Sequence, residues 1–131
     1  MAKAGVSFDE VRRIGLQLQD VEDGSMYGSP ALKLRGRLIA CVAVHKSAEP
    51  GSLVVRTDFE ERTALLNEAP ETYYLTDHYV THPVVLVRMS RIGRDQLRDL
   101  LASAWRFVAA HEARKKRVTA AAEPSRRDRD R

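Results

Sequence analysis

The chain has 131 residues, of which 44% are hydrophobic and 31% charged, a composition typical of one soluble globular domain. Its longest unbroken apolar run, residues 38–44, is far shorter than the roughly 20 residues of a membrane-spanning helix. The first residues form no apolar leader and the single Cys41 excludes an internal disulfide, so we expect a cytoplasmic protein in which Cys41 is a small buried hydrophobe.

The formal net charge of +4 comes from the C-terminal segment. Residues 1–110 carry 14 basic and 14 acidic side chains, whereas residues 111–131 carry 8 basic and 4 acidic ones. We therefore expect residues 1–110 to form the folded domain and residues 111–131 a basic tail. Helix propensity favours some extension of the last helix into this tail, but residues 123–131 have no apolar side chain to bury and predict disorder.

The first expected element is a short helix that begins after Ser7. Glu10 follows Ser7 at the spacing of a capping box, in which each side chain hydrogen-bonds the backbone N–H of the other residue. The polar residues after this helix, around Gly24, predict a loop.

The next expected elements are three strands in an antiparallel meander. Apolar and basic residues alternate up to Gly36, and an apolar run follows it, so the pattern predicts two strands joined by a tight turn at Gly36. Residues 53–58 predict the third strand, after a second turn.

The second half of the chain predicts two helices with two strands between them. Asp58 and Glu61 repeat the capping spacing, so a helix begins there and ends before Pro70. Residues 72–80 and 83–92 are rich in β-branched and aromatic residues, which favours strands. The last helix is the clearest, because its apolar residues share one face: Leu97, Leu100, Leu101, Ala104, Trp105 and Val108.

Several motifs in order resemble the MmcQ/YjbR family, over roughly residues 8–110. They are YGSPALKLRGRLIA (27–40), LVVRTDFEER (53–62), YYLTDHY (73–79), HPVVLVRM (82–89) and DQLRDLLASAWRFVA (95–109). The positions that match the family pattern are Tyr27, Gly28, Pro30, Gly36, Tyr74, Asp77, His78, Tyr79 and Pro83.

This resemblance implies a compact α+β domain, similar to the frataxin-like and secretion-chaperone-like folds. In it a twisted antiparallel sheet, here of about five strands, packs against an N-terminal helix, a middle helix and a long C-terminal helix. Members of the family are commonly described as DNA-binding, so the resemblance also implies a nucleic-acid partner. It supplies no catalytic residues.

The first candidate site is a basic face of the meander. Lys33 and Arg35 alternate with leucines, Arg37 follows the turn, and Arg56 alternates with valine on the third strand. If these side chains converge, they form a strip suited to phosphate contacts, although an ordinary solvated sheet face has the same pattern. The tail adds a second basic cluster, Arg114, Lys115, Lys116 and Arg117, which would attract polyanions or serve only solubility.

The second candidate lies in residues 73–89. His78 and His82 would share a metal ion on one helix face, but in an extended chain they stand about 13 Å apart, and only a tight reversal at Val80 and Thr81 would bring them together. We therefore expect no metal site. Two other interpretations stay open. Asp77 and His78 could bond strand ends at a structural corner, or Tyr27, Asp77, His78 and Tyr79 could line a groove for a small molecule or peptide.

No catalytic constellation is visible in the sequence. There is no glycine-rich phosphate loop in a strand–turn–helix context, and no serine has histidine and carboxylate partners at a motif spacing. We therefore expect a non-enzymatic protein without a cofactor. The first hypothesis is weak electrostatic binding of nucleic acid, and the alternative is an interaction module that uses the tyrosine and histidine groove.

Overall fold

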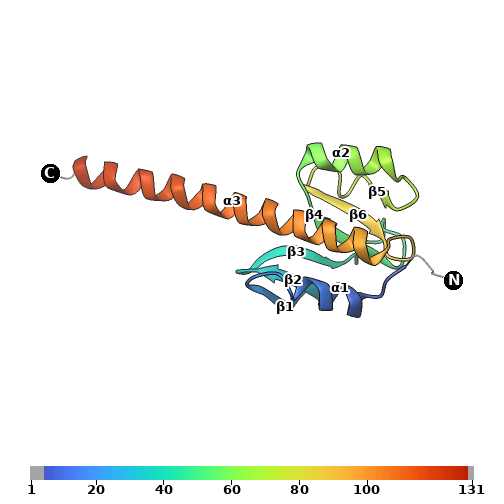
Figure 1. Ribbon diagram of the computed structural model, residues 1–131. Coiled ribbons are helices and arrows are strands. Elements are labelled where there is room, and N and C mark those ends of the chain that lie inside the picture. The colour runs from blue at the N-terminus through green and yellow to red at the C-terminus, as the bar shows by residue number, and fades with distance from the viewer. Residues whose placement is uncertain (1–4, 130–131) are drawn as a thin grey trace.

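The structure is a computed structural model that describes residues 5–129, and the side chains of residues 5–114. Within this range three helices accompany one antiparallel sheet of six strands (Figure 1). In chain order the elements are α1 (Phe8–Gly15), β1 (Val21–Met26), β2 (Ser29–Leu34), β3 (Arg37–Val42), β4 (Ser52–Arg56), α2 (Phe59–Glu68), β5 (Tyr73–Tyr74), β6 (Val84–Arg88) and α3 (Arg94–Arg129).

The α+β class and the antiparallel sheet are confirmed, with one strand more than the five expected. The strand order is β1-β2-β3-β4-β6-β5, and every neighbouring pair is antiparallel. The additional strand is β1, so the prediction of a polar loop around Gly24 is wrong. β1 lies at the sheet edge, and its residues 22–25 are exposed. An edge strand of this kind buries neither face fully, so its sequence lacks the apolar alternation by which strands are predicted.

Two tight turns link the first three strands. Tyr27 and Gly28 have φ angles of 53° and 78°, and Arg35 and Gly36 have φ angles of 50° and 83°. Two successive positive φ angles are typical of the two-residue hairpin turn whose twist matches that of the flanking strands. The predicted turn at Gly36 is confirmed, and the exposed tips of both hairpins carry a large side chain.

Both predicted helix starts are confirmed. The Ser7 side chain accepts from the Glu10 backbone N–H and the Glu10 carboxylate accepts from the Ser7 N–H, which completes the capping box of α1. At α2, Asp58 Oδ1 accepts from the Glu61 N–H at 2.6 Å. These caps satisfy backbone donors that have no partner inside a helix.

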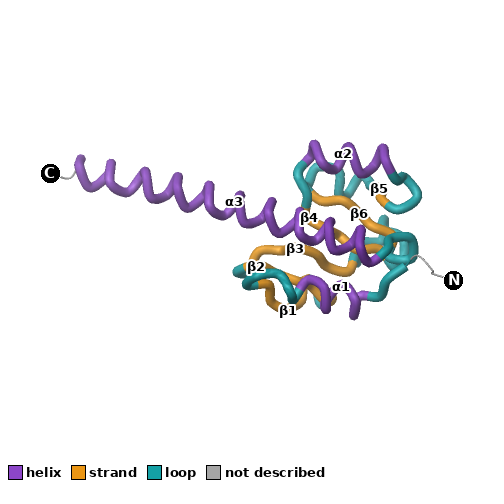
Figure 2. Tube along the Cα trace, in the orientation of Figure 1, coloured by secondary structure: helices purple, strands orange, loops and turns teal. Residues whose placement is uncertain are grey.

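All three helices pack against the same face of the sheet. Buried residues of α1 and α3 and partly buried leucines of α2 join Leu32 and Leu34 in one main core. Figure 2 shows α3 passing along the sheet, where it contacts β3 and β4. Five of the six predicted apolar positions of α3 are buried, namely Leu97, Leu100, Leu101, Ala104 and Val108. The sixth, Trp105, is partly buried and donates from Nε1 to the Gln19 carbonyl at 2.8 Å.

The opposite face of the sheet carries a smaller second cluster. Its buried members are Ala31, Cys41, Val54, Val84 and Leu86. The loop between β3 and β4 adds Ala43 and Ala48 at its rim, while Tyr74 and Tyr79 reach it from the other side. The loops of residues 43–51 and 75–83 therefore help to cover this face of the sheet, whereas helices cover the other face.

Helix α3 continues beyond the sheet to Arg129 (Figure 1). Its backbone is thus helical through residues 111–129, including positions at which composition predicts disorder. Alanine, arginine, lysine and glutamate are strong helix formers, which accounts for the helical backbone of residues 112–117. The assignment of residues 111–131 to a separate tail stays a prediction. Among the described residues, no helix combines the length and apolarity that crossing a membrane requires.

Candidate functional site

The structure divides the four predicted strand basics between two faces of the sheet. Lys33 stands opposite Leu38 in the sheet register, and Leu38 packs against the second cluster. Arg37 stands opposite Leu34, whose side chain lies in the main core beneath the helices. Since directly opposed residues of antiparallel strands point to the same face, Lys33 and Arg37 lie on opposite faces. A single strip made of all four residues is therefore excluded.

Arg35 is held by carboxylates. It occupies the hairpin turn rather than a strand, which corrects the expectation that it points away from the leucines. Its Nη2 contacts Asp20 Oδ2 at 2.8 Å, and its Nη1 contacts Glu112 Oε1 of α3 at 3.0 Å. The hydrogen bond to Glu112 raises the pKa of Arg35. The pairing ties the β2–β3 hairpin to α3 and partly neutralises its charge.

Arg37 and Arg56 lie together beside α3. Arg37 Nε is 3.8 Å from Glu112 Oε2, a looser contact than that of Arg35. The Arg56 guanidinium lies over the Phe107 ring, 5.3 Å from its centroid. Burial lowers the pKa of Arg56, and the positive charge of Arg37 lowers it further. Within the described residues, Arg56 has no carboxylate within ion-pair distance and its buried Nε has no hydrogen-bond partner.

Three of the four strand basics thus meet α3 near residues 107–112. We call Arg35, Arg37 and Arg56 the arginine surface. Arg114, one of the predicted tail basics, is exposed on the same helix. Lys115, Lys116 and Arg117 lie on the helical backbone, but their side chains are outside the described residues.

The second predicted site is partly assembled. Tyr27 sits at the tip of the β1–β2 hairpin and is 86% exposed. His78 packs edge-to-face on Tyr79 with ring centroids 4.7 Å apart, and both lie in the loop 75–83. Asp77 is exposed beside them. Burial is the main cause that raises the pKa of Tyr79, and Tyr27 is close enough to add a small part of the increase.

The geometry expected for the histidines of this loop is wrong. The backbone of residues 76–82 turns tightly, since Tyr79 and Val80 donate to the Thr76 carbonyl and His82 donates to the Tyr79 carbonyl. The rings of His78 and His82 are 6.4 Å apart, not the 13 Å of an extended chain. The predicted strand at residues 72–80 is correspondingly reduced to β5, Tyr73 and Tyr74.

Sequence reasoning also missed His45, which lies in the loop 43–51. Its ring stacks on His78 with centroids 3.5 Å apart and an interplanar angle of 9°. His45 Nδ1 is hydrogen-bonded to the hydroxyl of Ser47, and that hydroxyl also bonds Thr76 across the two loops. No sequence signal could have found this pair, because the two histidines are far apart in the chain and belong to no motif. Even so, the described residues contain no group of three or more histidines, cysteines or acids placed to hold a metal ion.

A buried arginine of α2 fixes the loop 75–83. Arg62 donates through Nη1 to the carbonyls of His82 and Val84 at 2.8 and 3.2 Å. Its Nη2 donates to the Val80 carbonyl at 3.1 Å, and its guanidinium lies over the Phe59 ring. These carbonyls end the tight turn and lead into β6, so Arg62 determines where the histidines stand. In the sequence it reads as an ordinary exposed helix residue.

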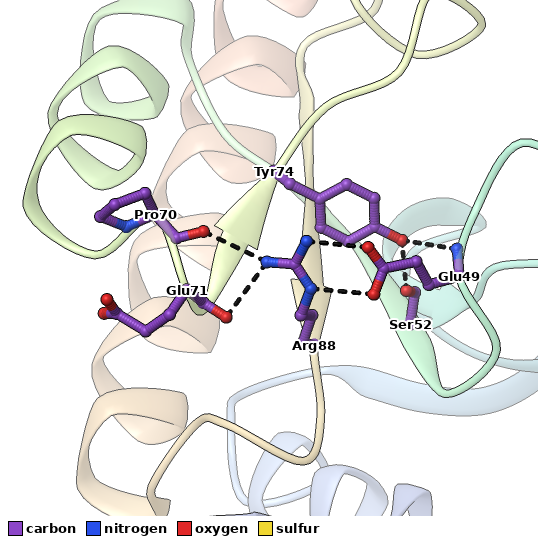
Figure 3. A network of polar contacts seen from close by, with 6 residues as sticks. All are labelled: Glu49, Ser52, Pro70, Glu71, Tyr74 and Arg88. Carbon is purple, nitrogen blue, oxygen red and sulfur yellow. Dashed lines mark hydrogen bonds and ion pairs between the residues drawn. The ribbon is translucent and has the colours of Figure 1, made fainter.

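A second network ties the loop 43–51 to β6 and to the segment around β5 (Figure 3). Arg88 of β6 makes a two-pronged contact with Glu49, at 2.9 and 2.8 Å, and lies over the Tyr74 ring. Its Nη1 also donates to the carbonyls of Pro70 and Glu71. The hydrogen bond from Arg88 lowers the pKa of Glu49. The arginine therefore acts as a structural junction between three segments of the chain.

Cys41 behaves as expected of a small buried hydrophobe. It is 6% exposed within the second cluster. Burial raises the pKa of its thiol to about 11, so the thiolate that a nucleophile needs is nearly absent at neutral pH.

No protein-family model matches the chain, and no curated protein matches it. The resemblance to the MmcQ/YjbR family stays a prediction that rests on the motifs themselves.

Proposed function

We propose that the protein binds nucleic acid weakly, through contacts between the phosphate backbone and the arginine surface. The observation that carries the proposal is the pairing of Arg37 with Arg56 beside α3. Burial and the positive charge of Arg37 both lower the pKa of Arg56, and within the described residues only Glu112, 3.8 Å from Arg37, stands close as a counter-charge. A bound phosphate would relieve this repulsion.

The chemistry of the two arginines fits a phosphate group. A guanidinium presents a planar set of donors that matches two phosphate oxygens, and it stays charged at all physiological pH values. Phe107 supports the Arg56 guanidinium from one side, which limits the conformational entropy lost on binding. Arg35 is already engaged by Asp20 and Glu112, so we assign it a smaller contribution.

Helix α3 offers a continuation of this surface. The exposed Arg114 follows Glu112 on the same helix, and the predicted basic cluster extends to residue 117. Nucleic acid lying along α3 would meet the arginine surface first and this cluster next. The resemblance to a family commonly described as DNA-binding supports the same assignment. The proposal involves no reaction and no cofactor, and it predicts binding without a strong base preference because phosphates carry no sequence information.

Fluorescence anisotropy of labelled duplex and single-stranded DNA, with the full chain at about 50 mM salt, tests the proposal. We expect the double variant Arg37→Gln and Arg56→Gln to bind at least about tenfold more weakly than the wild type. Arg98→Gln is the matched control, because Arg98 is an exposed arginine of α3 paired with Asp95. Thermal unfolding of each variant checks that the fold is retained.

Substitution of Lys115, Lys116 and Arg117 by glutamine distinguishes the contribution of the arginine surface to DNA binding from that of the basic cluster. If this triple variant loses all binding while the Arg37 and Arg56 variant binds like the wild type, the helix end is a nonspecific polycation. The arginine surface would then have no role in binding.

The alternative, a non-enzymatic interaction module around Tyr27, Asp77, His78 and Tyr79, is favoured by one observation. Tyr27 is 86% exposed at a hairpin tip, and Tyr79 packs edge-to-face on His78 in the loop 75–83. A tyrosine ring so exposed suits contact with a protein segment or small molecule. Under this alternative, Tyr27→Ala would abolish binding of that partner and leave DNA affinity unchanged.

A further inference from the structure

Two loops on the helix-free face of the sheet meet through a pair of histidines. His45 belongs to the loop 43–51 and His78 to the loop 75–83, and their rings stack at 3.5 Å with an interplanar angle of 9°. Tyr79 contacts both rings edge-on, at 6.2 and 4.7 Å. Face-to-face contact at this distance is favourable for neutral imidazoles, but two imidazolium rings would repel each other.

The charged neighbours of the pair in the sequence are one basic and one acidic residue, Lys46 and Asp77. Lys46 is next to His45, and the His82 ring lies 6.4 Å from that of His78. Asp77 is exposed beside His78. Among the described residues, no carboxylate lies within ion-pair distance of either stacked histidine. Burial lowers the pKa of His45, and the neighbouring His78 and Lys46 lower it further.

The pair borders apolar surface through Tyr79, which contacts both histidine rings. Ala48 from one loop and Tyr79 from the other pack against the second cluster, which includes the buried Cys41 and Leu86. Each loop therefore contributes at least one side chain to the cover of this cluster.

We propose that His45 and His78 form a proton-sensitive clasp between the two loops. The neutral stack holds the loops 43–51 and 75–83 together near neutral pH. Protonation in mildly acidic conditions breaks the stack, and the loops move apart to expose the second cluster. This inference does not rest on nucleic-acid binding, because the arginine surface meets α3 and shares no residue with the two loops.

The direction of the pH dependence follows from proton linkage. The folded state holds His45 with a pKa below its ordinary value of about 6.5, so it binds fewer protons than the unfolded chain. The stabilisation by the clasp is therefore complete above about pH 6.5 and is lost as the pH falls below that value.

We expect opening to remain local, because the Glu49–Arg88 ion pair keeps its charges at a pH at which histidine becomes protonated. Arg88 lowers the pKa of Glu49, so their ion pair persists to a more acidic pH than that at which histidine becomes charged (Figure 3). Tyr74 accepts from the Glu49 backbone N–H at 2.8 Å, a contact that does not titrate in this range. This network keeps the loop 43–51 attached to β6 when the clasp opens, and Arg62 keeps its bonds to the Val80 and His82 carbonyls of the other loop.

Amide hydrogen exchange of the full chain at pH 5.5 and 7.5, with labelling times corrected for the intrinsic rate, tests the clasp. We expect protection in segments 43–48 and 75–82 to fall at least about tenfold at pH 5.5, with β6 unchanged. If the exchange of these segments, corrected for the intrinsic rate, is the same at the two pH values, the proposal is wrong.

Variants distinguish the stack from other titrating groups. His78→Phe keeps an aromatic ring but removes the nitrogens that can be protonated. In this variant the amides of both loops should therefore stay protected from exchange at both pH values. His82→Gln is the matched control and should keep the wild-type pH response, because the His82 ring does not stack on the pair. If His78→Phe disturbs the fold, His45→Phe supplies the same test from the other loop. A full pH response in both phenylalanine variants would refute the role of the pair.

Discussion

Substitution of Arg62 by methionine should remove the support of the histidine loop and destabilise the protein. Methionine retains an unbranched side chain over Phe59 but has no donors for the three carbonyls at 2.8, 3.1 and 3.2 Å. At roughly 1 kcal/mol net for each hydrogen bond, the free energy of unfolding should fall by about 3 kcal/mol. For a chain of this size that corresponds to a melting temperature lower by about 12 °C.

The assay is urea unfolding followed by far-UV circular dichroism, with thermal melting as a second measure. Arg62→Lys keeps the charge but loses the planar fork, so we expect it to recover about half of the lost stability. Arg98→Met removes an exposed arginine from α3 and should change the stability by less than about 0.5 kcal/mol. If Arg62→Met is as stable as Arg98→Met, the carbonyl contacts of Arg62 do not stabilise the loop and the reasoning fails.

Two further substitutions and one chemical treatment test the packing of the second cluster, with Tyr27 as the exposed comparison. Tyr74→Phe should lower the stability by about 1–2 kcal/mol, because the lost hydroxyl bonds both the Glu49 N–H and the buried Ser52 hydroxyl. Tyr27→Phe, at an exposed tip, should leave the stability within about 0.5 kcal/mol of the wild type in the same urea titration. Cys41, with a thiol pKa of about 11 and 6% exposure, should react with a disulfide reagent at pH 8 only as fast as the chain unfolds. Immediate reaction in the absence of urea would show that the cluster is open at that pH.

Much of the fold was predictable because its signals are local. The caps at Ser7 and Asp58 depend on residues three positions apart, and the turn at Gly36 depends on one residue that tolerates a positive φ. The apolar face of α3 is a repeat within one element. β1 escaped prediction because an edge strand can be almost wholly polar, and because its partner strand is set by topology.

The sites were less predictable because they depend on contacts between distant segments. Alternation correctly separated Lys33 from the leucines of β2, but it could not show that Arg37 points to the helix face or that Glu112 would meet Arg35. The stacking of His45 on His78 joins residues from two loops. Arg62 looks solvent-exposed in the sequence, and its carbonyl partners come from the turn of residues 76–82 and the start of β6. In each case the missing information is the tertiary arrangement.

The central claim, that the arginine surface contacts phosphates, is tested most directly by the salt dependence of DNA affinity. Each phosphate contact on duplex DNA contributes about 0.9 to the slope of the logarithm of affinity against the logarithm of salt concentration. For full chains titrated between about 50 and 200 mM salt, the Arg37→Gln and Arg56→Gln double variant should therefore have a slope smaller than that of the wild type by about 1.8. The Arg98→Gln control should keep the wild-type slope. A double variant whose slope equals that of the wild type would contradict the account.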